Sequence, residues 1–100
     1  MGSFHYVVID AYMAMFHATR AILYDEGIQE KSHFAMYIYL KEKCAQKIPL
    51  PIIHLLNLYR TERHEAMYGL EYHPTKQEAA QALKDAETFV AEIEKVLLKS

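Results

Sequence analysis

Several polar side chains in the third quarter of the chain recur at helical spacing, and their chemistry suits a phosphate group. Arg60, His64 and Tyr68 follow one another at intervals of four residues, and Arg63 directly precedes His64. Side chains at i and i+4 lie on one face of an α-helix. Together with Tyr72 they would suit a nucleotide or a scissile phosphodiester, because guanidinium groups bind phosphate oxygens and imidazole transfers protons near neutral pH. The same pattern is equally typical of a solvated helix end.

Arg63 interrupts an apolar stripe, between Tyr59 and Met67 of the same predicted helix. A buried guanidinium without a partner is energetically costly, so this side chain must meet a carboxylate, reach the surface or face a polar cleft. One interpretation is an ion pair with Asp10, the acidic residue in the middle of the first predicted helix. The other is a cleft arginine that holds a phosphate. The sequence leaves both open.

The composition excludes several catalytic and ligand-binding motifs. With glycine only at Gly2, Gly27 and Gly69, neither phosphate-binding pattern, GxxxxGK[ST] or GxGxxG, can be formed. A zinc-protease helix needs two histidines at i and i+4, but Tyr68 occupies the second position after His64. The other histidines show no paired spacing. We therefore expect neither a metal site nor a cofactor.

Two further reactive side chains, His33 and Cys44, have ordinary structural interpretations. A lone histidine at the start of a predicted helix is more often a surface or capping residue, so His33 joins Arg60 and Tyr72 only as a secondary binding candidate. Cys44 is expected to be a buried small hydrophobe. The expected inner side of the second helix consists of Phe34, Tyr37, Ile38 and Cys44.

Four segments have helical periodicity and no strand pattern competes, which predicts an all-α fold. Gly27 and Gly69 are expected at helix ends, Ser32 is the expected N-cap of the second helix, and Thr75 and Glu78 form a capping box before the fourth. The expected helices cover about residues 4–26, 32–46, 51–69 and 75 to near the end of the chain. We predict a single domain over residues 1–100, folded as an antiparallel up-and-down four-helix bundle.

The overall composition restricts the class of protein. The 100 residues are 52% hydrophobic and 24% charged, which is typical of a folded globular chain rather than a disordered one. With 11 basic and 13 acidic residues, the formal net charge of −2 argues against strong non-specific binding of nucleic acid. No apolar run approaches the ~20 residues of a membrane span. A single cysteine fits a reducing cytosol, so we expect a cytoplasmic protein without membrane contact.

Two stretches, DAYMAMFHATRAIL at residues 10–23 and RHEAMYG at residues 63–69, carry a family resemblance. The first resembles the second-helix signature of the HEPN (higher eukaryotes and prokaryotes nucleotide-binding) domain family. The Gly27 turn and the Lys31-Ser32-His33 run resemble the entry to the next helix of that family. The second stretch is similar to a segment of its small stand-alone members. The resemblance extends over nearly the whole chain.

This resemblance implies an antiparallel helical bundle that commonly dimerises. Many members are metal-independent ribonucleases of toxin–antitoxin systems, often with a nucleotidyltransferase as the antitoxin. Their catalytic motif is an arginine followed, after four to six residues, by a histidine, and two protomers bring their motifs into one cleft. Here the motif begins at Arg63 and polar His64 and would end at Tyr68. The resemblance therefore implies that these three residues form a site for RNA or a nucleotide in a dimer cleft.

The chain departs from the family pattern in two respects. Tyr68 replaces the expected histidine, and a phenol with a pKa near 10 accepts protons poorly at pH 7. The first helix of the family is also expected to be missing, which would leave an apolar flank of residues 7–23 facing water. We therefore predict a homodimer, or docking of a separate chain. The alternative function is a catalytically inactive module that binds a nucleotidyltransferase or another protein.

Overall fold

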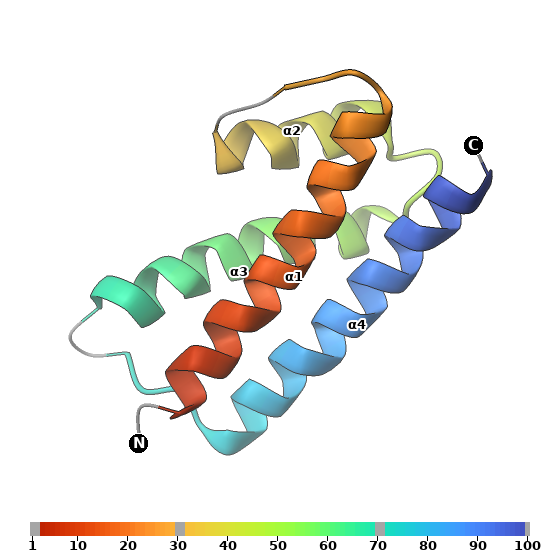
Figure 1. Ribbon diagram of the computed structural model, residues 1–100. Coiled ribbons are helices and arrows are strands. Elements are labelled where there is room, and N and C mark those ends of the chain that lie inside the picture. Colours follow the sequence, from red (N-terminus) through yellow and green to blue (C-terminus); the bar gives the residue numbers. More distant parts are fainter. Residues whose placement is uncertain (1–2, 30–31, 70–71, 100) are drawn as a thin grey trace.

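The fold consists of four α-helices joined by short loops. The computed structural model describes residues 3–29, 32–69 and 72–99. Its helices are α1 (Ser3–Asp25), α2 (His33–Lys43), α3 (Leu50–Tyr68) and α4 (Lys76–Lys99) (Figure 1). These described residues contain no strand, so the predicted all-α class is confirmed. None of the four helices is long and apolar enough to cross a membrane.

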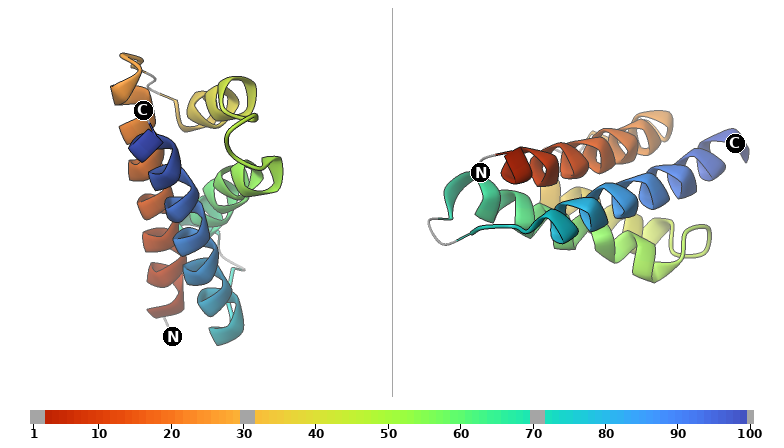
Figure 2. Two further views of the ribbon diagram at one scale, coloured as in Figure 1. Left: turned by 90° about the vertical axis from the view of Figure 1, so that its right-hand side faces the viewer. Right: turned by 90° about the horizontal axis from the view of Figure 1, so that it is seen from below.

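The helices pack as a bundle in which α1 contacts all three others. α1 and α4 lie side by side and run in the same direction, and α3 packs against both and runs the opposite way (Figures 1 and 2). The predicted helical bundle is confirmed. Its helices do not alternate strictly in direction, however, because α1 and α4 run the same way. The short helix α2 lies across the end of α1 and packs mainly on α3, with which it forms an antiparallel pair. Because α2 lies across the bundle, the next helix, α3, runs opposite to α1.

The predicted helix ends are confirmed by local hydrogen bonds. The Ser32 side chain accepts a hydrogen bond from the Ala35 amide at 3.3 Å and caps α2. At the start of α4, the Thr75 amide donates to Glu78 Oε1 at 2.8 Å and the Glu78 amide donates to Thr75 Oγ1 at 3.1 Å. Gly27 has a φ of 73°, a value that favours glycine. These caps satisfy backbone groups that a helix end would otherwise leave unpaired.

The buried face of α2 matches the prediction only in part, since Tyr37 is buried but Phe34 is not. Its buried residues are Met36, Tyr37 and Leu40. Phe34, by contrast, is 48% exposed, and Ile38 is only half-buried. Because α2 lies across the bundle, only a narrow stripe of this helix faces the core; Phe34 lies outside that stripe, and Ile38 packs against the core while remaining partly exposed.

Cys44 is buried, as predicted, although α2 ends one residue before it. The Cys44 amide donates to the Leu40 carbonyl, and the Ile48 amide donates to the Cys44 carbonyl at 2.9 Å. These bonds close a turn where the sequence predicted a further helical turn. Burial is the main cause of a raised pKa of the Cys44 thiol, which makes the thiol a poor nucleophile.

The core is organised around α1. The large side chains with almost no exposed surface include Val8, Tyr12, Met15, Met36, Leu40, Ile53, Leu56, Phe89 and Ile93. Burial of each such apolar side chain contributes about 1.5–3 kcal/mol to stability. The buried Thr19 hydroxyl donates to the Met15 carbonyl at 2.9 Å, so it is satisfied within the helix. The position of α1, and with it that of Tyr12, is therefore strongly determined.

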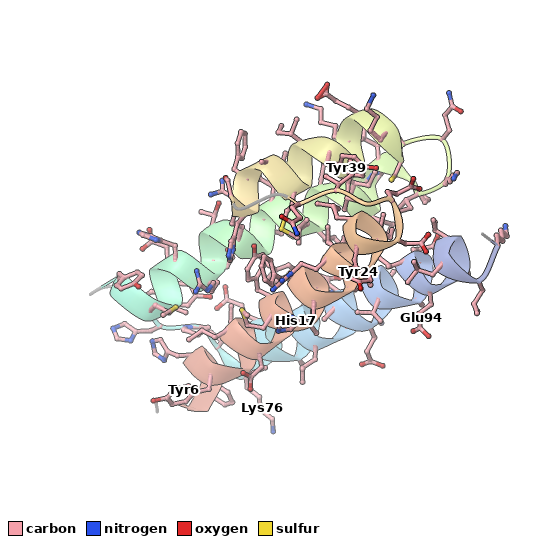
Figure 3. The ribbon with its side chains drawn as sticks, turned by 45° about the horizontal axis from the view of Figure 1, so that its top comes forward. Tyr6, His17, Tyr24, Tyr39, Lys76 and Glu94 are labelled. Atoms are coloured by element: carbon pink, nitrogen blue, oxygen red, sulfur yellow. The ribbon has the colours of Figure 1, made fainter. Side chains whose placement is uncertain are left out.

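The opposite side of α1 borders a groove of about 390 Å³ against α4, here called the α1–α4 groove. Its lining residues are Asp10, Ala11, Ala14, Leu83, Ala86, Glu87, Val90 and Glu94. Figure 3 shows Tyr6, His17 and Tyr24 spaced along α1 and Glu94 on α4. Most large apolar side chains of residues 7–23 are at least partly buried, so the predicted exposed flank is reduced to this groove and to scattered outward side chains.

Candidate functional site

A cleft of about 390 Å³ between α2 and α3, here called the α2–α3 cleft, brings together four of the six predicted site residues. It is lined by His33 from α2 and by Arg60, Thr61, Arg63 and His64 from α3. On α3, Arg60 and Arg63 lie three residues apart and His64 follows, so all reach one side of the helix. His33 is thirty positions away from Arg63 in sequence. It joins them because the first turn of α2 crosses α3.

Arg63 has an unsatisfied guanidinium in this cleft. Its Nε is buried and has no hydrogen-bond partner. No ion pair of Arg63 occurs among the described residues, and Asp10 is exposed and lines the α1–α4 groove instead. The predicted ion-pair interpretation is therefore wrong. The guanidinium carbon lies 5.9 Å from the centroid of the Tyr12 ring, which gives it a cation–π contact but no acceptor. A half-buried guanidinium whose Nε lacks an acceptor among the described residues is suited to an anionic ligand.

Arg60 adds a second guanidinium, and its orientation is fixed. Its Nε donates a hydrogen bond to Asn57 Oδ1 at 3.1 Å. Its guanidinium carbon lies 5.2 Å from the centre of the Phe34 ring. The two contacts leave the terminal nitrogens of Arg60 available to bind an anion. Because the side chain is already ordered, less conformational entropy is lost when a ligand binds.

His33 is held from two sides by α1. Its Nδ1 is hydrogen-bonded to the Tyr12 hydroxyl at 2.8 Å, and its ring stacks on Phe16 with centroids 4.2 Å apart and planes at 25°. Burial, followed by the charges of Arg63 and Arg60, lowers the pKa of His33. Burial also raises the pKa of Tyr12 to about 12, so the hydroxyl keeps its proton. His33 is thus an oriented imidazole that is neutral at pH 7.

Tyr68 and Tyr72, the two predicted tyrosines, lie outside the residues that line the cleft. Tyr68 is 65% exposed, and its ring centroid is 5.0 Å from that of His64, one turn before it. Tyr72 lies instead beside the start of α1, where its carbonyl is hydrogen-bonded to His5 Nε2 at 2.7 Å. Burial, and then the nearby charge and hydrogen bond of Glu62, raise the pKa of the Tyr72 phenol. The structure does not bring Tyr72 to the arginines.

Sequence reasoning did not identify Tyr12 and Phe16 as residues that support the site. Both belong to the apolar stripe of α1, and periodicity alone assigns them to the core. The ring of Tyr12 is indeed almost fully buried, but its hydroxyl reaches His33. The sequence does contain two aromatic residues in α1 and a histidine at the start of the next helix, which could have indicated this site. That the rings contact the histidine follows only from the packing of α2 against α1. Lys31, which precedes this cap, lies outside the described residues.

The comparisons with known proteins agree with this fold. The chain belongs to the HEPN domain family, whose pattern matches residues 1–96. It is also 34% identical, over 102 residues, to a UPF0332 protein of Archaeoglobus fulgidus, an alignment that covers 100% of this chain and 81% of the relative. No solved structure shows a significant match to the chain. Membership of this family indicates a function related to nucleotides or RNA.

Proposed function

We propose that the protein binds RNA through phosphate groups in the α2–α3 cleft and cleaves it without a metal ion. The observation that carries this proposal is Arg63, whose buried Nε has no hydrogen-bond partner and whose guanidinium has no acidic partner among the described residues, in a cleft with Arg60 and two histidines. A single-stranded backbone supplies the anions that such a cleft lacks. Two arginines would hold the phosphoryl oxygens and stabilise the charge that develops on them in the transition state.

The electrostatics favour a local site rather than a broad nucleic-acid surface. The net charge of the chain is −2, so affinity must come from the few cations of the cleft. Glu62, an acidic neighbour of Arg63 in sequence, is hydrogen-bonded to the Tyr72 side chain. Binding should therefore be moderate in strength and should weaken with salt.

The proposed assembly is a homodimer that joins two such clefts, with a nucleotidyltransferase as antitoxin in a toxin–antitoxin system. Two exposed apolar side chains beside the cleft, Phe34 and Met67, support a contact with a second protomer. Met67 is four residues after Arg63, on the same side of α3. Light scattering coupled to size exclusion should give twice the chain mass at micromolar concentration, and a monomer at that concentration would contradict the dimer.

The catalytic proposal is tested with purified protein, structured and unstructured RNA, and EDTA. Arg63→Ala should lower the cleavage rate by about 100-fold or more, as expected for loss of a charge-stabilising donor. Lys84→Ala, which removes an exposed cation of α4, is the matched control and should cleave like the parent. Equal background cleavage by all three proteins would show that the activity is a contaminant and would contradict the proposal.

The alternative, a catalytically inactive interaction module, draws support from the α1–α4 groove. This groove is lined by small and aliphatic side chains and carries the exposed carboxylates of Asp10, Glu87 and Glu94. Its chemistry fits an amphipathic helix of another chain that has lysines or arginines beside its apolar face. A stable complex with a nucleotidyltransferase, weakened by Leu83→Glu and formed by a protein that cleaves no RNA, would favour this function.

A further inference from the structure

The α2–α3 cleft contains a histidine that comes from a different helix than the arginines. His33 is the first residue of α2, and its ring is fixed by the Tyr12 hydroxyl at 2.8 Å and by the Phe16 ring at 4.2 Å. Because Tyr12 occupies Nδ1, Nε2 is the ring nitrogen without a protein partner among the described residues. Since His33 also lines the cleft, its ring is positioned to meet a ligand held by Arg60 and Arg63.

We propose that His33 Nε2 accepts the proton of the ribose 2′ hydroxyl when RNA is cleaved in this cleft, and that Tyr12 is the residue that positions it. This inference rests on the proposed function and names the group that replaces the histidine expected at position 68. It also defines the substrate as a strand with a free 2′ hydroxyl next to the scissile phosphate.

The Tyr12–His33 hydrogen bond is compatible with both uptake and release of a proton at His33 Nε2. When His33 Nδ1 carries the proton, it donates to the Tyr12 oxygen and leaves the Nε2 lone pair free to act as a base. After Nε2 has taken up a proton, the same Nδ1–H···O bond remains and stabilises the imidazolium. A tyrosine hydroxyl can both donate and accept, so the contact also permits the other neutral tautomer.

The reaction balances with the groups that line the cleft. His33 Nε2 removes the 2′ proton, and the 2′ oxygen forms a bond to phosphorus. The bond from phosphorus to the 5′ oxygen then breaks, and that oxygen takes a proton from His64, which lines the same cleft and acts as the general acid, while water accepts the proton held by His33 and restores that of His64. The products are a 2′,3′-cyclic phosphate and a free 5′ hydroxyl. Arg63 and Arg60 bind the non-bridging oxygens throughout.

The other residues near the motif are less suited to accept the proton. Tyr68 is 65% exposed and does not line the cleft, and a phenol is mostly protonated at pH 7. His64 is exposed, and no hydrogen bond of its ring is found among the described residues. His33, in contrast, is oriented by two contacts. The charged and titratable groups that face it are Tyr12 from α1 and Arg60, Arg63 and His64 from α3.

The test measures single-turnover cleavage in EDTA and, separately, binding of an uncleavable 2′-O-methyl RNA. His33→Asn should lower the cleavage rate by about 100-fold or more while binding changes little. Free imidazole should restore part of the activity of His33→Ala. Tyr12→Phe should cause a smaller loss and move the acidic limb of the pH–rate profile to lower pH, because the imidazolium loses an acceptor. Circular dichroism verifies that each variant is folded.

The outcomes separate this inference from the proposed function. If His33→Asn cleaves as fast as the parent while Arg63→Ala is inactive, the role of His33 is overturned and the ribonuclease proposal stands. If Tyr12→Phe lowers the rate without moving the pH profile, Tyr12 has only a structural role and the positioning claim fails. If the parent binds 2′-O-methyl RNA but cleaves no RNA, both the inference and the cleavage proposal are overturned.

Discussion

The α2–α3 cleft and the α1–α4 groove have the same volume, about 390 Å³, but opposite chemistry. The cleft is lined by two arginines, two histidines and a threonine, and none of the described residues that line it is acidic. The groove is lined by alanine and aliphatic side chains and by three carboxylates. A net charge near zero therefore conceals a separation of charge across the molecule. An anion is attracted to the cleft and repelled from the groove.

A single helix, α1, contributes to both regions. Tyr12 is hydrogen-bonded to His33, which lines the cleft, whereas Asp10 and Ala14 line the groove. Because α1 packs against all three other helices, the positions of the side chains on both of these sides of α1 are determined together. Because no acidic side chain of α1 lines the cleft, the cationic side chains of α3 face it without a competing carboxylate from that helix.

The largest effect on RNA cleavage is expected for substitution of Arg63 in the cleft. Arg63→Ala should reduce RNA cleavage by about 100- to 1000-fold, and Arg63→Lys should recover only part of that loss because an ammonium cannot make the paired hydrogen bonds of a guanidinium. Glu87→Gln, the control in the groove, should leave the rate unchanged. Comparable rates for Arg63→Ala and Glu87→Gln would contradict the assignment of the phosphate site to the cleft.

A smaller effect concerns the salt dependence of binding. Two arginine–phosphate contacts predict a slope of about −1.4 when log K for single-stranded RNA is plotted against log salt, and Arg60→Ala should reduce its magnitude by about 0.7. Fluorescence anisotropy with a 2′-O-methyl oligonucleotide measures this slope. A slope that Arg60→Ala leaves unaltered would mean that Arg60 makes no phosphate contact.

The stability of the protein should depend weakly on pH through His33. Burial and then the charges of Arg63 and Arg60 lower its pKa in the folded state. Below about pH 6.5 the unfolded chain therefore binds more protons than the folded one, and the free energy of unfolding decreases as the pH falls through the folded pKa. His33→Asn should remove this component, and His17→Asn should not. Melting temperatures between about pH 5 and pH 7 test the sign; an identical slope in His33→Asn would contradict it.

The smallest effect on RNA is expected in the groove. Leu83 is 47% exposed there, so Leu83→Glu should change stability by only a few tenths of a kcal/mol. RNA cleavage and the salt slope should remain those of the parent. A clear loss of RNA binding in folded Leu83→Glu would show that the two regions are not functionally separate.

The sequence predicts the local features well, because their causes are local. The caps at Ser32 and Thr75 and the turn at Gly27 follow from side chains within three residues of the bonds they make. Arg63 is also predictable as an unusual residue, since it breaks an apolar stripe. Whether its partner is Asp10 or a ligand depends on how α1 is rotated against α3, and periodicity does not determine that rotation.

The composition of the cleft depends on packing between distant segments. His33 meets Arg63 only because the short α2 lies across α3, and the same arrangement explains why Phe34 is exposed rather than buried. Tyr72 was predicted to join the arginines on the basis of its chemistry, but α3 ends at Tyr68 and Tyr72 lies beside the start of α1. The contact of Tyr12 with the site could not be predicted from the sequence, because its ring is buried in the core while its hydroxyl is hydrogen-bonded to His33.

The most direct test of the account is an NMR titration of the isotopically labelled protein with a single-stranded 2′-O-methyl RNA. We expect chemical shifts to change for the amides of residues 60–64 and the start of α2, and for the side chains of His33 and Arg63. The amides of residues 83–94 in the groove should remain unchanged. Shifts concentrated in the α1–α4 groove, with the α2–α3 cleft unaffected, would contradict it.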